Sequence, residues 1–420
     1  MKEIINKKGK FWISNKENSF NGKITYENNQ FYLNPQDNFK EFEYDKIEII
    51  KGIVENIPLT LYKCNLIDNE YIIFKFLFKN HTDETLFFKS IEVKFNNMEN
   101  WIRKSVVTQR NRNNINILAD KEEYMLDDFK LTLLFNKHIN KTINTFNVTN
   151  DFKIKIEYFD EIQFDKLLEE LNIISNFLSI CMYKQTNIQS LKLENTIIVF
   201  NQFFNDDTDT LNFYNILINY DLISERFGEI LGKWFEINDI FKNTIYLYLM
   251  NISYKTNAET MFLTYTQSLE AFIRKNNNFK KFYMDFEDYE EIKEKFYNFM
   301  GDMDLKSDHR QSLKSKIKYG NEYSLRKRLK ILMNYLKSYD FIGNLNEKYG
   351  GKFINYIVDT RNYYTHYGDE GEYKTSGGEL LLLAYDLKLL LELCLLHELD
   401  LSKELINLCL SKKINNIRLL

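Results

Sequence analysis

Proline occurs only twice in this chain, at Pro35 and Pro58, and both positions lie within the first 60 residues. Proline interrupts a helix more strongly than any other residue, because it lacks a backbone donor and its ring clashes with the preceding turn. The rest of the 420-residue chain is therefore free to form long helices. Its 14 glycines are about half the usual share of roughly 7%, which argues against a glycine-rich cofactor-binding fold.

The N-terminal part, up to about residue 160, carries the pattern of β-strands. Short segments rich in Ile, Phe, Tyr and Thr are separated by clusters of Asn, Asp and Gly. Predicted strands span residues 22–26, 30–33, 59–64, 71–78, 86–95, 129–135 and 152–159, and a helix over 163–182 and a strand over 188–200 follow. Several of these segments alternate apolar and polar residues, which favours an antiparallel sandwich-like or barrel-like sheet.

The C-terminal part carries the spacing of amphipathic helices. Predicted helices span residues 225–251, 258–275, 288–300, 324–337, 351–367 and 378–399. Apolar stripes of this kind need partner helices, so a bundle is expected. The sequence therefore predicts the α+β class. A β-rich, sandwich-like domain over residues 1–210 precedes an all-α bundle over 211–420, with a weak boundary at the acidic segment 205–209.

Charge and cysteine content exclude several classes of protein. The net charge of −4 excludes a general basic coat for nucleic acid, although it allows a local basic groove. The four cysteines form no Cys-x-x-Cys pair and no zinc-ligand spacing with histidine, so no metal and no cofactor are predicted. Charged residues interrupt the most apolar stretch, 380–401, and the N-terminus lacks an apolar segment. We therefore expect a cytoplasmic protein without a membrane partner.

One short segment near the C-terminus brings together residues that can carry chemistry. On a helix, positions three, four and seven apart share a face, so Asp359, Asn362 and His366 form one polar stripe. An amide or carboxylate on that stripe can fix the tautomer of the imidazole. Arg361 lies about 140° around the helix, and its long side chain can still reach a shared ligand. Gly368, Gly371, Gly377 and Gly378 predict a flexible connection after this segment.

Arginine and histidine together suit the cleavage of a phosphodiester. Arginine binds phosphate with two parallel hydrogen bonds, and histidine can move a proton at neutral pH. RNA supplies its own nucleophile in the 2′-hydroxyl, so neither a protein nucleophile nor a metal is required. The products would be a 2′,3′-cyclic phosphate and a 5′-hydroxyl end. The spacing alone is common, and the plain alternative is a solvated helix end with no catalytic role.

The segment 361–366 resembles the catalytic motif of HEPN domains, a family of helical-bundle ribonucleases. That motif has Arg, a polar residue directly after it, and His after four to six intervening residues, and here Asn362 follows Arg361. Residues 262–272, 324–329 and 390–396 resemble the family's earlier, middle and closing helices, in the correct order. Residues 9–13, 22–26 and 59–64 resemble the β-rich N-terminal domain of the narrower, ApeA-like family of anti-phage defence proteins.

The resemblance implies a role for each matching residue. Arg361 would bind the scissile phosphate, His366 would transfer protons, and Asn362 would orient His366 or the substrate. Glu270 would match a polar residue found beside the motif, although an i,i+4 pair with Arg274 is an equal alternative. Candidate RNA contacts are Tyr364, Asp359, Arg326, Lys327 and Arg328, although such basic residues more often form a solvated charged face.

Three functions follow from this reading. The first is a metal-independent endoribonuclease of abortive infection, which cleaves RNA, with tRNA as one candidate, as a homodimer through the HEPN domain. Its N-terminal domain would sense a phage-derived trigger or restrain the nuclease. The second is a non-catalytic HEPN adaptor that binds RNA or a protein partner. The third is a ligand-binding β-domain whose helices serve only dimerisation.

Overall fold

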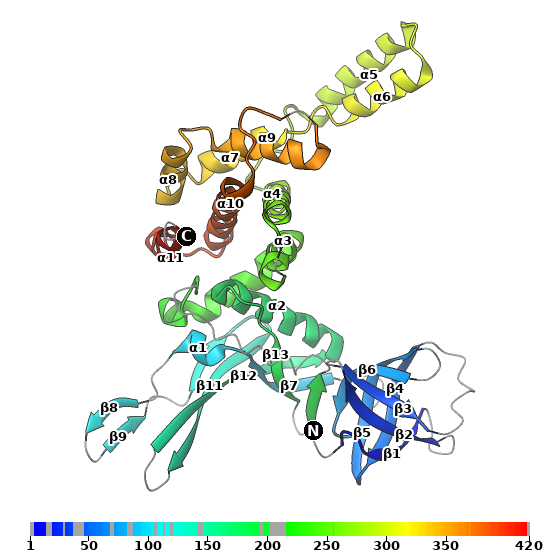
Figure 1. Cartoon of the computed structure of the whole chain (residues 1–420), viewed down its shortest axis with the longest axis vertical. Helices are drawn as coiled ribbons and strands as arrows, with labels where there is room; N and C mark the ends of the chain where they lie inside the picture. Colours follow the sequence, from blue (N-terminus) through cyan, green and yellow to red (C-terminus); the bar gives the residue numbers. More distant parts are fainter. Residues whose placement is uncertain are drawn as a thin grey trace. The chain divides into compact units, whose positions relative to one another are not determined.

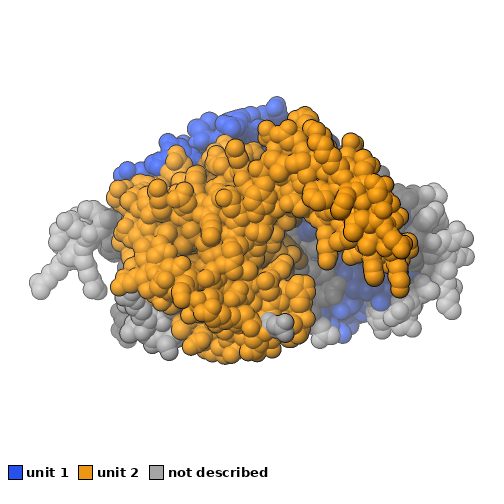
Figure 2. Space-filling view, turned by 90° about the horizontal axis from the view of Figure 1, so that it is seen from above, with its two compact units in different colours: residues 1–232 blue, residues 233–420 orange. Residues whose placement is uncertain are grey.

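The computed structural model describes residues 4–13, 19–27, 30–36, 46–67, 71–81, 87–103, 107–111, 114–117, 121–141, 146–193, 196–200, 216–254, 256–368 and 370–417. The chain divides into two compact units, residues 1–232 and 233–420, which Figure 2 colours separately. The predicted domain boundary at 210 and the acidic segment 205–209 lie outside the described residues. That boundary therefore stays a prediction.

Six antiparallel strands of the first unit close into a barrel (Figure 1). They are β1 (Lys8–Trp12), β2 (Ser19–Glu27), β3 (Gln30–Pro35), β4 (Lys46–Val54), β5 (Ile57–Ile67) and β6 (Tyr71–Phe78). The strand order is β6-β3-β2-β1-β4-β5, and the pairing of β5 with β6 completes the ring. The prediction of an antiparallel sheet is confirmed. Because the ring of strands is closed, this sheet has the barrel-like form of the two that were predicted.

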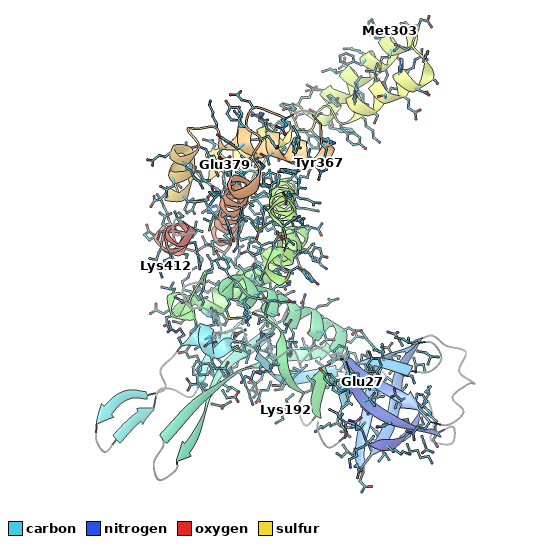
Figure 3. All side chains as sticks on the ribbon, in the orientation of Figure 1. Glu27, Lys192, Met303, Tyr367, Glu379 and Lys412 are labelled. Atoms are coloured by element: carbon cyan, nitrogen blue, oxygen red, sulfur yellow. The ribbon has the colours of Figure 1, made fainter. Side chains whose placement is uncertain are left out.

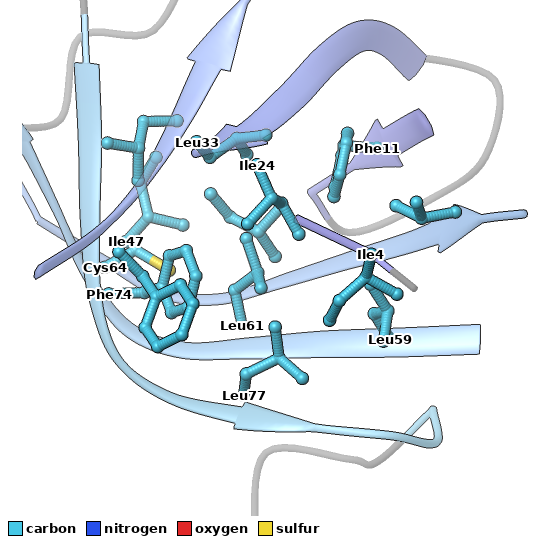
Figure 4. Packing of buried hydrophobic residues seen from close by; sticks show 14 of the residues in the cluster. Ile4, Phe11, Ile24, Leu33, Ile47, Leu59, Leu61, Cys64, Phe74 and Leu77 are labelled. Atoms are coloured by element: carbon cyan, nitrogen blue, oxygen red, sulfur yellow. The ribbon is translucent and has the colours of Figure 1, made fainter. Parts of the chain in front are cut away.

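The barrel is filled by apolar side chains from alternate positions of its strands. Phe11, Ile24, Leu33, Leu61 and Phe74 belong to this core, and each is at most 1% exposed (Figure 4). Strand residues that alternate between the two faces of a closed sheet place every second side chain inside it. The described interior is therefore a packed core.

A second, open sheet continues from the barrel through β6. Its strands are β7 (Phe87–Phe95), β10 (Lys121–Met125), β11 (Phe129–Lys141), β12 (Phe146–Gln163), β13 (Ile188–Leu193) and β14 (Thr196–Phe200). β6 pairs with β3 at Ile72 and Ile73 and with β14 at 76–78, so one strand serves both sheets. β8 (Val107–Asn111) and β9 (Asn114–Ile117) form a separate pair, and α1 is Met98–Ile102.

Helix α2 (Phe164–Met182) packs on the open sheet and begins at its corner with the barrel. The ring of Phe164 lies 5.7 Å from Tyr62 of β5 and 5.3 Å from Phe76 of β6, measured between ring centroids. Edge-to-face aromatic contacts at such distances contribute about 0.5–1.5 kcal/mol each beyond the burial of area. This aromatic cluster joins the helix to both sheets. The 3₁₀ turns η2 (Tyr220–Leu222) and η3 (Ser224–Arg226) follow later in the chain.

The rest of the chain is helical. The helices are α3 (Phe227–Ser253), α4 (Ala258–Lys275), α5 (Phe286–Asp302), α6 (Ser307–Lys318), α7 (Leu325–Tyr335), α8 (Asp340–Lys348), α9 (Phe353–His366), α10 (Gly377–Glu398) and α11 (Lys403–Ile417). α10 packs along α4 and is buried almost all round (Figure 1). Within it Glu392 is fully buried and accepts a hydrogen bond of 2.7 Å from the Tyr248 hydroxyl.

The predicted α+β class is confirmed, and the six helices expected after residue 211 are present within a few residues. The helices α1, α6, α8 and α11 and the strands β1, β4, β8, β9 and β10 were not predicted from the sequence. The single strand expected over 188–200 is two paired strands, β13 and β14. No helix in the described part of the chain is long and apolar enough to cross a membrane.

Candidate functional site

The candidate catalytic residues lie in the last two turns of α9. The buried side of this helix carries Phe353, Ile357 and Thr360, which hold it against the bundle. Arg361 is half-buried, whereas Asn362 and His366 are exposed. The helix ends at Tyr367, whose left-handed φ of 48° allows its N–H to bond back to the carbonyl of Tyr363 at 2.6 Å. The chain turn thus leaves the imidazole at the open end of the helix.

The polar partners of this stripe differ from those expected. Asn362 Oδ1 accepts a hydrogen bond of 3.3 Å from Arg361 Nη1, and Thr365 Oγ1 donates to the Arg361 carbonyl at 2.7 Å. Among the described residues, no hydrogen bond to the imidazole of His366 is formed, either from Asn362 or from Asp359. The expectation that Asn362 or Asp359 fixes the tautomer of the His366 imidazole is therefore not met within one chain.

Asp359 serves instead as a link between three segments. Its Oδ1 lies 3.6 Å from Arg326 Nη2 of α7, and its Oδ2 accepts from the backbone N–H of Tyr373 at 3.3 Å. Arg326 also donates to Asn355 Oδ1 on α9. A Cβ at Gly371 would lie 2.8 Å from the Asp359 carboxylate, so this approach requires glycine. In this structure Asp359 and Arg326 fix α9 to α7 and to the following loop.

The loop after α9 is bonded to the helix at several of its residues. The N–H of Thr375 donates to Thr360 Oγ1 at 3.1 Å, and the Tyr373 ring packs 5.3 Å from the ring of Tyr356. Lys374 Nζ lies 4.3 Å from the centre of the Tyr363 ring. The loop therefore holds Tyr373 against the first turn of α9 and brings the Lys374 cation to Tyr363, near the end of α9 that carries His366.

Three tyrosines surround this end of the helix. The Tyr363 ring lies 5.1 Å from Tyr364 and 5.9 Å from Tyr367, each in an edge-to-face arrangement. Burial raises the pKa of the Tyr364 hydroxyl, which donates to the Thr375 carbonyl at 3.4 Å. Tyr367, which is labelled in Figure 3, is 74% exposed. An exposed aromatic ring of this kind can stack on an unpaired base.

Glu270 lies in a different cluster, made of charged residues from α4, α7 and the segment before α7. Its Oε1 accepts from Arg274 at 3.1 Å, as the i,i+4 alternative predicts, and lies 3.8 Å from Arg328 Nη1. Glu322 accepts from Arg274 at 2.8 Å and from Arg328 at 3.0 Å. The hydrogen bond from Arg274 is the main cause of a lowered pKa at Glu322. The cluster ties α4 to α7.

The predicted site residues thus separate into groups. Tyr364 of α9 interacts electrostatically with Glu259 at the start of α4, and Glu270 lies eleven residues further along. That separation is about 16 Å along the helix axis, so Glu270 is not beside His366 within one chain. Arg328 is only 3% exposed and faces the carboxylates of Glu270 and Glu322, so its guanidinium is not accessible to RNA. Lys327 is exposed, with its Nζ 5.6 Å from the Tyr323 ring centre.

Two further features define what kind of site this is. A cavity of about 390 Å³ lies between α8, α10 and α11, where the carboxylate of Asp386 accepts from Lys348 and Tyr349 at 2.6 Å each. No residue of α9 lines it, so this cavity is separate from the candidate site. Across the described ranges, no three His, Cys, Asp or Glu side chains are grouped so that they could hold a metal ion.

The sequence reading missed Lys374 and the anchoring roles of Thr375 and Glu322. Each of these residues acts across a tertiary contact, so no local spacing marks it. A sign was present in the run of polar and aromatic residues 372–375, which is unusual for a purely flexible loop.

Two family models match the chain. The model described as ApeA N-terminal domain 1 matches residues 6–234, and the model described as Apea-like HEPN matches residues 263–405. The second match contains α9 with Arg361, Asn362 and His366, and also Glu270. Comparisons with curated proteins and with solved structures found no match.

Proposed function

Because this chain belongs to the ApeA-like family, with an ApeA N-terminal domain followed by an Apea-like HEPN domain, we propose that it is an anti-phage endoribonuclease. The observation that carries the proposal is the open end of α9. There an arginine and an exposed histidine lie five residues apart on one helix, inside the HEPN match, beside a cluster of tyrosines. This is the arrangement that a phosphodiester in solution can reach.

The proposed reaction needs only these groups and the RNA itself. The 2′-hydroxyl attacks the adjacent phosphorus and the 5′-oxygen of the next nucleotide leaves, which yields a 2′,3′-cyclic phosphate and a 5′-hydroxyl. His366 moves the protons between these oxygens, since an imidazole titrates near neutral pH. Arg361 binds the non-bridging oxygens and stabilises the charge that develops on them. Asn362, which accepts from Arg361, orients the guanidinium.

Two copies of the site are proposed to act together. HEPN domains commonly pair, and pairing at α9 would place two copies of Arg361 and His366 across one cleft. Such pairing would supply the fixed polar neighbour that His366 lacks among the described residues of one chain. It could also bring the exposed Lys327 to the RNA backbone.

The N-terminal region is proposed as the sensor or regulatory part. Uncontrolled cleavage of cellular RNA would be lethal, so the nuclease needs a restraint. We propose that residues 1–210 respond to a phage-derived trigger and that residues 211–420 carry the activity, in the cytoplasm. The substrate is RNA, with tRNA as one candidate.

The test compares wild type with His366→Ala and Arg361→Ala during phage infection, with sequencing of RNA ends that carry a cyclic phosphate. We expect both variants to lose cleavage and protection while their circular dichroism spectra stay unchanged. His309→Ala is the matched control, because His309 is also exposed but lies on α6. Addition of EDTA should leave cleavage by purified protein intact.

A non-catalytic adaptor is the second candidate function. It is favoured by the lack of a hydrogen-bond partner for the His366 imidazole among the residues that the structure describes, which is unusual for a proton shuttle. If Arg361→Ala and His366→Ala both retain phage protection, catalysis is not the function and the adaptor role stands. A ligand bound by the β-rich part, without RNA cleavage under any trigger, would instead favour a ligand-binding protein.

A further inference from the structure

The exposed apolar surface of the second unit is concentrated in one short part of the chain. Nine large apolar side chains between residues 282 and 319 are at least 38% exposed. They are Phe282, Tyr283, Met284, Phe286, Phe296, Phe299, Met303, Leu313 and Tyr319. A contiguous exposed apolar surface on a folded protein commonly marks a site of interaction.

This part of the chain is a helical hairpin made of α5 and α6. Only Met300 of α5 is buried, and no residue of α6 is. The two helices are joined by the hydroxyls of Tyr289 and Tyr297, which donate to the carbonyls of Ile317 and Lys314. Met303 marks the tip of the hairpin, far from the other helices of the second unit (Figure 3). The hairpin therefore has too little core of its own to cover its apolar residues.

The base of the hairpin is nevertheless firmly held. The buried side chain of Asn321 accepts from the N–H of Met284 at 3.0 Å and donates to its carbonyl at 2.9 Å. The N–H of Tyr323 donates to the Lys281 carbonyl at 3.0 Å, which pairs the two ends of the hairpin. The next residue, Glu322, belongs to the charged cluster that ties α4 to α7. The hairpin is thus an anchored arm.

The apolar side chains of α5 form one stripe. Ile292, Phe296, Phe299 and Met303 follow the spacing i, i+4, i+7 and i+11, which places them on one face of a helix. Phe296 is 51% and Phe299 is 64% exposed. A stripe of this kind is typical of a helix that packs against another helix.

The charges of the hairpin indicate which helix packs against the apolar stripe of α5. α5 carries six acidic and two basic residues, whereas α6 carries one acidic and four basic residues. The ion pairs within α5, Lys293 with Glu290 and Lys295 with Glu291, are intrahelical. Among the described residues, no ion pair joins α5 to α6 within the hairpin. Its acidic and basic helices therefore keep charges available for an oppositely charged partner.

We propose that the hairpin is a self-association arm, which pairs with the hairpin of a second copy of this chain about a twofold axis. In that arrangement α5 of one copy lies against α6 of the other, and the apolar stripes are covered between them. A twofold interface uses the same patch on both copies, and a patch with one acidic and one basic helix is complementary to itself. An RNA strand is a poorer occupant, because the acidic α5 would repel its phosphates.

This pairing is separate from the proposed cleavage and from pairing at α9. The test is sedimentation of the full-length chain over a range of concentrations. We expect wild type to associate, and Phe296→Ser with Phe299→Ser to halve its mass. The matched control replaces Tyr246 and Tyr254, which are 65% and 69% exposed outside the hairpin, with serine, and should keep the wild-type mass.

A second test exchanges the charges of α5 and α6. Restored association in the doubly exchanged variant would show that the first exchange had not simply unfolded the hairpin. Lys316→Glu with Lys318→Glu should weaken association by roughly tenfold or more, since like charges would face each other. Adding Glu287→Lys and Glu294→Lys on α5 should restore it. A monomeric wild type, an unchanged mass in the hairpin variants, or failure of the exchange would overturn the proposal. An unchanged mass with lost RNA affinity would mean that the hairpin binds RNA instead. Loss of cleavage in His366→Ala at unchanged mass leaves the proposal intact.

Discussion

At the scale of single residues, burial sets the chemistry of the cysteines. All four are buried, and Cys409 of α11 is only 1% exposed. Burial raises the pKa of the Cys409 thiol from 9.0 to about 11. The folded chain therefore keeps this proton at a pH where the unfolded chain has lost it.

This shift predicts a pH dependence of stability. Because the folded pKa is raised, the contribution of Cys409 is fully present below pH 9 and is lost as the pH rises toward 11. Between pH 8 and pH 10, Cys409→Ala should lose less free energy of unfolding than wild type, by roughly 1 kcal/mol. Urea unfolding at the two pH values measures the difference. Equal losses in the two proteins would contradict the assigned shift.

Gly52 of β4 provides a second residue-scale prediction. A Cβ at this position would lie 2.3 Å from the Phe11 ring, which fills the barrel beside it. Gly52→Ala should therefore destabilise the protein by about 1–3 kcal/mol, as overpacking of a core commonly does. Gly343→Ala in α8 is the control, because nothing lies within 4 Å of its Cβ and alanine favours a helix. Thermal unfolding should show a lower midpoint only for Gly52→Ala.

At the scale of elements, the Asp359 link decides how α9 is held. Asp359→Ala removes both the contact with Arg326 and the acceptor for the Tyr373 N–H, and should cost about 1–2 kcal/mol of stability. It should also lower RNA cleavage, because the loop with Lys374 is released from α9. Asp359→Asn keeps an acceptor for the Tyr373 N–H, so this variant should retain more of the stability and more of the RNA cleavage than Asp359→Ala. If Asp359→Asn and Asp359→Ala lower cleavage equally, the ion pair with Arg326 holds the loop, and the hydrogen bond from the Tyr373 N–H does not.

Elements with a strong periodic pattern could be predicted from the sequence, and the others could not. α4 and α10 carry continuous apolar stripes, so their bounds were predicted within a residue or two. α6 buries no residue and α8 has only nine, so neither gives a helical stripe long enough to recognise. Closure of the barrel also depends on the short pairing of β3 with β6, two strands that are far apart in the sequence. No local pattern encodes such a choice between sheet forms.

The candidate site was predictable to the same extent. Arg361, Asn362 and His366 lie on one helix, so spacing alone places them together. The partner of Asp359 is Arg326, 33 residues earlier on another helix, and only the tertiary structure brings it there. The alternative for Glu270, a pair with Arg274, was visible because it is local.

At the scale of the whole molecule, a net charge of −4 means that the proposed RNA binding would depend on a few local cations. The KM for RNA should therefore rise with salt, roughly tenfold between 50 and 200 mM if two or three phosphates are contacted. Lys327→Gln should reduce the slope of log KM against log salt by about 0.7, the value for one phosphate of a single strand. Lys403→Gln, an exposed charge on α11, is the matched control and should leave the slope unchanged.

The closed barrel also affects how readily the β-rich part of the protein aggregates through unpaired edge strands. A strand with unpaired backbone groups at the rim of a sheet is a template for aggregation. In the described part of the chain, the ring of β1–β6 has no such rim, and the open sheet ends at β10. That strand has only five residues, and its outward Lys121 and Glu123 are charged. Short length and alternating charge are the usual protection against fibril-like growth, so the β10 edge should resist it even at high expression.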